Sequence, residues 1–197
     1  MQAPFLFVVM ALVLLLAPGP TNTLLLVGSA TDGLRSSLRL VPAELLGYLI
    51  AIHVLVFSIG PFVHASHTAQ IVLRIGIAFY LVWLAGKLWV TGSSLPQQKA
   101  VTPQHVFVVT LLNPKAAIFA FVVLPPLADG HWLSTAPYLL GLSVLIIGAS
   151  LGWISLGAAI GSGRFVRISP RIIRCLASAA LIIFAAFISI PRELVIH

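Results

Sequence analysis

Six long apolar stretches, separated by short polar segments, account for most of the sequence. A helix needs about 20 apolar residues to cross the roughly 30 Å hydrocarbon core of a bilayer. Stretches of that kind lie at residues 4–30, 42–63, 69–90, 105–127, 136–160 and 172–190. The short alternating segments that build membrane β-barrels do not occur in the sequence. The pattern therefore predicts an all-α integral membrane protein with six transmembrane helices.

Prolines and one serine mark several of the predicted helix ends. Pro42 and Pro137 suit the first turn of a helix, where a missing N–H has no intrahelical acceptor to lose. Ser169, directly before Pro170, is expected to cap the last stretch, and Pro191 is expected to end it. The first stretch has neither the basic segment nor the cleavage site of a signal peptide, so we expect it to be a retained span.

The composition excludes a soluble domain and several kinds of site. Hydrophobic residues make up 60% of the chain and charged residues 8%, with a mean hydropathy of +1.13, whereas soluble domains carry roughly 25% charged residues. A single cysteine, Cys175, excludes an internal disulfide, a CxxC redox pair and a thiolate metal cage. The lipid bilayer is therefore the expected partner of this chain. No nucleic acid partner is expected, because the net charge of +7 is explained by membrane orientation.

Basic residues gather in alternate loops of the predicted topology. Of the 11 Lys and Arg residues, most fall on one side, namely Arg35, Arg39, Lys87, Lys99, Arg164, Arg167, Arg171 and Arg174. Arg192 falls on the other side. Because basic loops stay in the cytoplasm, both termini are predicted to lie outside it.

The six predicted spans divide into two sets of three, as an inverted duplication would produce. Because three is an odd number, a duplicated three-helix unit has to insert upside down the second time. We expect a single transmembrane domain over residues 1–197, with repeats at 1–95 and 102–197 and a cytoplasmic linker at Thr91–Pro103.

The first helix of each predicted repeat is broken by proline. The two breaks comprise Pro18, Gly19 and Pro20 in the first helix and Asn113, Pro114 and Lys115 in the fourth. Matching breaks in inverted halves indicate a transporter's substrate site near the bilayer midplane. Proline leaves a carbonyl without its donor, and each new half-helix begins with N–H groups that favour anions.

The residues around the breaks predict how a substrate binds. Asn113 is expected to cap the second half-helix, with the Lys115 ammonium beside it, while Thr21 and Asn22 line the first half-helix. A substrate carboxylate would meet backbone donors and an ammonium together. The alternative is that the prolines only kink the helices for packing.

Three stretches of sequence resemble a known family of transporters. APGPTNTLLLVGSATDGLRSS, GIAFYLVWLAGKLW and VTLLNPKAAIFAFVVLPP are similar to motifs of the lysine exporter (LysE/RhtB-type) family, in the same order and over essentially the whole chain. The resemblance implies a bacterial inner-membrane exporter of amino acids or close derivatives, driven as a secondary transporter by the proton gradient. In such a membrane, the side on which the loop charges place both termini is the periplasm. No cofactor is expected.

Other polar residues in the spans have two interpretations each. Arg74 either serves as a second carboxylate anchor or extends outward to the interface. His53 and Glu44 are candidates for proton coupling, because histidine titrates near neutral pH and Glu44 is the acidic residue of the second span. Alternatively, His53 is a packing residue, and Glu44 and Asp32 pair with Arg35 or Arg39 near the inner interface.

Other functions of a membrane protein remain as alternatives. A metal-ion exporter of related architecture is disfavoured, because clustered intramembrane carboxylates and further cysteines are missing and no metal site is expected. An enzyme is disfavoured because HExxH, GxSxG and paired intramembrane aspartates are missing. A non-transporting assembly subunit would not need polar breaks. A homo-oligomer is possible through two GxxxG pairs, at Gly148 and Gly152 and at Gly157 and Gly161, which also suit packing within the chain.

Overall fold

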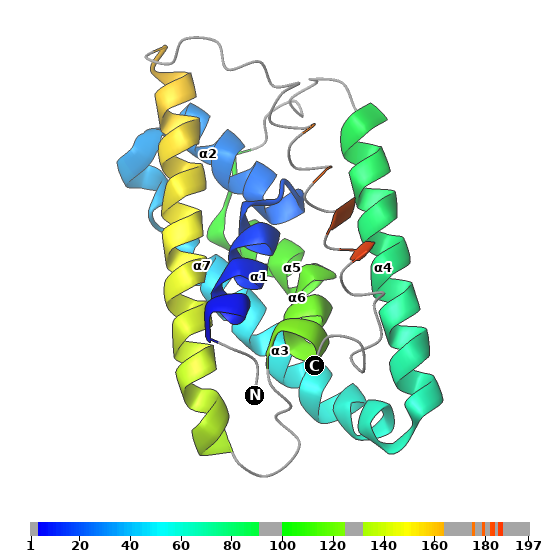
Figure 1. Ribbon diagram of the computed structural model, residues 1–197. Helices are drawn as coiled ribbons and strands as arrows, with labels where there is room; N and C mark the ends of the chain where they lie inside the picture. Colours follow the sequence, from blue (N-terminus) through cyan, green and yellow to red (C-terminus); the bar gives the residue numbers. More distant parts are fainter. Residues whose placement is uncertain are drawn as a thin grey trace.

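The computed structural model describes residues 4–90, 100–124 and 132–163, with single helical positions at 175, 179, 182, 183, 185 and 186. Within these ranges every regular element is a helix (Figure 1). The elements are α1 (Pro4–Leu16), α2 (Pro20–Ser37), α3 (Leu40–Ala65), α4 (His67–Val90), α5 (Pro103–Leu111), α6 (Lys115–Ile118), the π-helical turn η1 (Phe119–Val123) and α7 (Trp132–Gly161).

Two helices are long and apolar enough to cross a bilayer, and two bent pairs can add one span each. The long apolar segments are Leu40–Val63 in α3 and Thr135–Gly161 in α7. The first pair, α1 with α2, bends by 59°, and the second, α5 with α6 and η1, bends by 53°. The two pairs run in opposite directions (Figure 1). The apolar part of α4 is shorter, over His67–Trp83.

The architecture is that of a helical membrane protein, whereas the sixth span and the linker are not tested. The predicted stretch 172–190 lies outside the described residues except for a few positions, and so does most of Thr91–Pro103. The six-span inverted repeat therefore stays a prediction. Its two broken helices are present, because α1 ends at Leu16, two residues before Pro18, and α5 ends at Leu111, two residues before Asn113.

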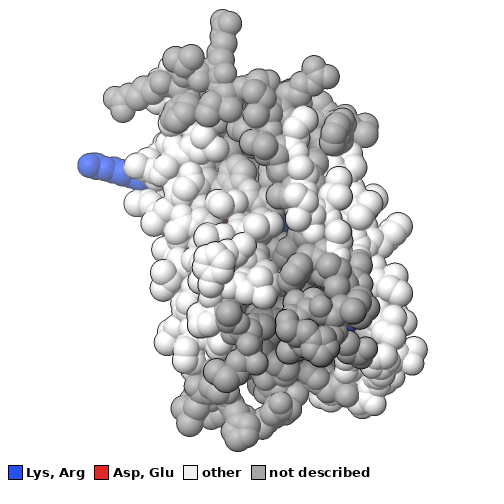
Figure 2. All heavy atoms as spheres, viewed as in Figure 1, with Lys and Arg blue, Asp and Glu red and all other residues white. Residues whose placement is uncertain are grey.

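Large apolar side chains cover the outside of the molecule, while polar side chains lie inside. Phe57 and Phe79 are 71% and 73% exposed, whereas Glu44 and Lys115 are 2% and 1% exposed. The face in Figure 2 is almost free of charged side chains where residues are described. This distribution is the reverse of that in a soluble protein and suits contact with lipid tails.

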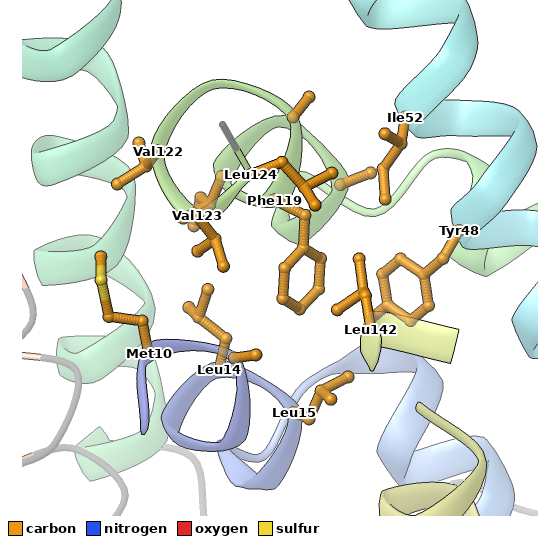
Figure 3. Packing of buried hydrophobic residues seen from close by; sticks show 14 of the residues in the cluster. Met10, Leu14, Leu15, Tyr48, Ile52, Phe119, Val122, Val123, Leu124 and Leu142 are labelled. Atoms are coloured by element: carbon orange, nitrogen blue, oxygen red, sulfur yellow. The ribbon is translucent and has the colours of Figure 1, made fainter. Parts of the chain in front are cut away.

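A buried apolar cluster holds α1, α3, η1 and α7 together (Figure 3). The Phe119 ring packs edge-on against Tyr48, with ring centroids 5.6 Å apart and an interplanar angle of 89°. Leu14 and Leu15 of α1 and Leu142 of α7 face the same cluster. Because lipid is as apolar as these side chains, close packing and not the exclusion of water stabilises the cluster.

One of the two GxxxG pairs is used for packing within the chain. A Cβ at Gly157 would overlap the Leu26 carbonyl on α2, and a Cβ at Gly161 would overlap the next turn of α2. Glycine therefore allows α7 and α2 to approach at backbone distance. Gly148 and Gly152 have open space where a Cβ would stand, as far as the described residues extend.

Several predicted helix ends differ from those in the structure. Pro137 lies inside α7, which begins at Trp132, because one proline removes a single backbone hydrogen bond and the preceding turn can still be helical. The first bent helix continues past residue 30 to Ser37, across a kink at Gly33 with a left-handed φ of 79° that favours glycine. The second span begins at Leu40, which places Pro42 in its first turn as predicted.

Candidate functional site

The two proline breaks lie against one another in the interior. The Lys115 ammonium, at the second break, donates to the carbonyl oxygens of Leu14 and Ala17, at the end of α1, over 2.7 and 2.6 Å. These contacts join residues about a hundred positions apart in the sequence. The structure thus brings together the two breaks that the sequence predicts to converge.

Pro18 explains why the end of α1 attracts polar side chains. The last regular bond there runs from the Ala17 N–H to the Val13 carbonyl, and proline has no N–H to offer Leu14. The Lys115 ammonium supplies that missing donor. A carbonyl left unpaired in hydrocarbon is costly, so the break itself favours a buried donor at this position.

The neighbouring carbonyls at the end of α1 are also bound by side chains. The Asn22 amide donates to the carbonyls of Leu15 and Ala17 over 2.7 and 2.8 Å. The Trp153 indole N–H, from α7, donates to Leu15 as well, over 3.2 Å. The carbonyl oxygens of Leu14, Leu15 and Ala17 therefore accept hydrogen bonds from side chains of α2, α7 and the second break.

Gly19 gives the ammonium room beside the first break. A Cβ at this position would lie 3.2 Å from Lys115 Nζ and 3.3 Å from its Cε. The backbone of Gly19 is extended, with φ −165° and ψ 177°, a conformation that every residue can adopt. The reason for glycine here is therefore the space that the lysine side chain occupies. α2 begins with Pro20 and has no side-chain cap.

A hydrogen-bonded cluster of neutral polar groups surrounds the second break. The Asn113 carboxamide oxygen accepts from the Lys115 backbone N–H over 3.0 Å, so Asn113 caps the half-helix as predicted. Its amide nitrogen donates to Thr21 Oγ1 and to the Tyr48 hydroxyl, over 3.0 and 3.4 Å. The Thr110 hydroxyl donates to the same Thr21 oxygen over 3.1 Å. α2, α3 and α5 thus meet at the break.

Glu44 places a carboxyl group in the same interior. Its Oε2 accepts from the Ser150 hydroxyl of α7 over 2.6 Å. Glu44 also interacts electrostatically with Lys115. Of the predicted pairs with Arg35 or Arg39, that of Asp32 with Arg39 is confirmed, over 3.7 Å, whereas Glu44 faces the interior and pairs with neither arginine.

Two predicted site residues lie away from the breaks. His53 is on the exposed side of α3, where its Nδ1 is 2.7 Å from the carbonyl oxygen of Leu49, one turn earlier, and its ring stacks on Phe57. Arg74 is partly buried on α4, and within the described part of the chain no hydrogen bond or ion pair was found that joins it to either break.

Several residues of the cluster were not identified from the sequence. Tyr48, Thr110, Ser150 and Trp153 all bond to groups at the breaks or to Glu44. Tyr48 is four residues after Glu44 and so shares a helix face with it, which is a signal that could have been used. The other three depend on which helices pack together.

The cluster is closed in this structure. Thr21, Tyr48, Thr110 and Lys115 are each at most 1% exposed. A small molecule can reach these groups only if the helices move apart. No group of three or more His, Cys, Asp or Glu side chains arranged to hold a metal ion occurs among the described residues.

The comparisons with known proteins agree with one another. The sequence model of the LysE type translocator family matches residues 12–191. An uncharacterized membrane protein of Vibrio cholerae serotype O1 (strain ATCC 39315 / El Tor Inaba N16961) is 28% identical over 178 residues, which cover 84% of either chain. No solved structure matches the chain. The family match extends over nearly the whole chain and includes both breaks, and the protein therefore belongs to the LysE type translocator family, a family of membrane transporters and not of enzymes.

Proposed function

We propose that the protein exports amino acids or close derivatives across the bacterial inner membrane, as a secondary transporter coupled to the proton gradient. The observation that carries this proposal is the contact between the two breaks, where half-helix ends and an ammonium group meet in a closed polar cluster. In transporters with broken helices, such ends bind the charged groups of the substrate.

The groups at the breaks suit a zwitterionic substrate. Pro20 itself has no N–H, but the residues that follow it at the uncapped start of α2 offer backbone N–H groups that favour a carboxylate. The Lys115 ammonium lies beside it, next to Gly19. Thr21, Asn22 and Asn113 can then bind the remaining polar atoms. A packing kink alone would not explain a charged lysine at 1% exposure.

Transport requires the closed cluster to open toward one side of the membrane at a time. Inverted repeats provide such a motion, because the two halves can exchange conformations around a fixed site. The opposite chain directions of the two bent pairs support this arrangement. In the proposed topology both termini are periplasmic and the Thr91–Pro103 linker is cytoplasmic.

Proton coupling is assigned to the interior carboxyl group of Glu44. Glu44 and Lys115 are both buried in the same interior and can carry opposite charges, so that binding a proton on Glu44 changes the electrostatics of the substrate site. His53 is the weaker candidate, since its ring is on the exposed side of α3. Arg74 remains a proposed second anchor that has to approach the breaks in another conformation.

A transport assay in proteoliposomes tests the proposed function. Purified protein is reconstituted, a pH gradient is imposed, and a panel of radiolabelled amino acids and derivatives is offered. At least one member is expected to move faster than in protein-free liposomes, and collapse of the pH gradient with an ionophore is expected to slow it. A panel in which no compound moves above the protein-free control would contradict the proposal.

A further inference from the structure

We infer that the carbonyl oxygens of Leu14 and Ala17 form a binding site for the primary ammonium group of the transported substrate, and that Lys115 occupies this site as a tethered competitor in the closed state. The inference rests on the proposed function and goes beyond it. It assigns the substrate's amino group to the first break, and it gives Lys115 a second position to move to.

The geometry at the first break is that of an occupied ammonium site. Lys115 Nζ is 2.7 Å from the Leu14 oxygen and 2.6 Å from the Ala17 oxygen, which are short distances for charged N–H donors. The ammonium is 1% exposed. Main-chain carbonyls at the end of a broken helix carry partial negative charge and bind cations in transporters.

The origin of these carbonyls makes the site a property of the backbone. Pro18 deprives the Leu14 carbonyl of its helical donor, and the end of the helix leaves the Ala17 carbonyl able to accept from other donors. Asn22 also donates to the Leu15 and Ala17 carbonyls, which helps to hold the Ala17 oxygen in place. If Lys115 leaves, the Leu14 oxygen needs another donor within a closed, apolar environment.

The lack of a side chain at Gly19 provides the space for an exchange. The position where its Cβ would stand is 3.2 Å from Lys115 Nζ. The end of the Lys115 side chain can therefore shift along the backbone of the break and leave the two oxygens to an incoming ammonium. The displaced Lys115 ammonium then lies beside the uncapped start of α2, where the substrate carboxylate binds. An amino acid thus replaces the Lys115 ammonium at the two carbonyl oxygens and adds a contact between its own carboxylate and Lys115, whereas a simple amine only replaces the ammonium.

Chemical complementation of a truncated lysine tests the site without measuring transport. Lys115→Ala removes three methylene groups and the ammonium, which together correspond to n-propylammonium. The purified variant, in a buffer free of primary amines, is expected to melt below the wild type. Added n-propylammonium is expected to raise its melting temperature by about 2–4 °C once the amine exceeds its dissociation constant several-fold, and further with the logarithm of the amine concentration.

Matched compounds and a matched variant separate the site from general effects of salt. Tetramethylammonium, which has the charge but no N–H donor, and 1-propanol, which lacks the charge, are expected to leave the melting temperature of Lys115→Ala unchanged. Arg35→Ala, which removes an exposed cation of α2, is expected not to respond to n-propylammonium. Equal stabilisation by tetramethylammonium or by sodium ions, or an equal response of Arg35→Ala, would overturn the inference.

The wild-type protein provides a second test if Lys115→Ala does not fold. Closed Lys115 is expected to resist reductive methylation, measured by peptide mass spectrometry, because its ammonium is buried. With a brief labelling pulse and reagent in excess over the amino group of the added amino acid, which also reacts, a saturating transported amino acid is expected to increase labelling of Lys115 at least several-fold as its ammonium is displaced. Labelling that stays constant or falls would contradict displacement.

The outcomes distinguish this inference from the proposed function. Amine-dependent stabilisation of Lys115→Ala without transport of any amino acid would support the ammonium site and contradict the function. Transport of amino acids would support the function, but it would overturn the site if n-propylammonium did not stabilise Lys115→Ala and an amino acid did not increase labelling of Lys115.

Discussion

Replacement of Gly19 tests whether the closed state depends on the space beside the first break. The position has an extended backbone that any residue can adopt, so a substitution there acts through its side chain and not through backbone strain. A Cβ would lie 3.2 Å from Lys115 Nζ and 3.3 Å from Cε. Both distances are below the optimum of about 3.5–4.0 Å for nonpolar contacts.

The expected cost grows with the size of the new side chain. Alanine requires the lysine end to move by a few tenths of an ångström, at a cost of roughly 1 kcal/mol. Leucine overpacks the site, which costs about 1–3 kcal/mol, and displaces the ammonium from at least one carbonyl, which costs about 1.5–3 kcal/mol more. We therefore expect Gly19→Leu to lower the free energy of unfolding by about 2.5–6 kcal/mol and to abolish transport.

Thermal melting in detergent and transport in proteoliposomes measure the two effects. Gly148→Leu is the matched control, because it adds the same side chain to an exposed position of α7 with open space around it. This control is expected to behave as the wild type, within about 0.5 kcal/mol. If Gly19→Leu melts and transports like Gly148→Leu, the lysine does not occupy the space assigned to it.

Three further predictions concern other parts of the fold. Asn22→Leu removes an amide that binds two carbonyls of α1, and because both carbonyls retain another donor we expect a loss of about 1–3 kcal/mol, measured by thermal melting. Gly157→Val is expected to prevent the packing of α7 on α2 and to give aggregated protein in size-exclusion chromatography, whereas Gly152→Val is expected to stay monodisperse. Reporter fusions at His197 and Gln98 are expected to place the C-terminus in the periplasm and the linker in the cytoplasm; a cytoplasmic C-terminus would contradict the inverted repeat.

The breaks could be predicted from the sequence because proline acts locally. The missing N–H of Pro18 identifies Leu14 as the carbonyl that loses its donor, whatever the rest of the fold. The group that replaces the donor, Lys115, lies 101 positions away. Its identity depends on how the two bent helices pack, and a single sequence does not contain that information directly.

For a related reason, the sequence did not show which side of a uniformly apolar helix is buried. His53 and Glu44 both lie in the second predicted span, yet one is exposed and the other is buried. A helix that is apolar on all sides has no hydrophobic stripe to show which face is internal. The small-residue motif at Gly157 could likewise be recognised in the sequence, but the helix that packs against it, α2, could not be predicted.

The selectivity of transport tests the central claim most directly, namely that the two breaks form one site for a zwitterion. The measurement compares the transported amino acid with the amine that lacks only its carboxylate, in the wild type and in Lys115→Met. If Lys115 receives the carboxylate, its removal eliminates one charge-assisted contact of about 1.5–3 kcal/mol. The preference for the amino acid over the amine should then fall roughly tenfold to 150-fold. An unchanged preference in a normally folded Lys115→Met would contradict the assignment of the substrate to the breaks.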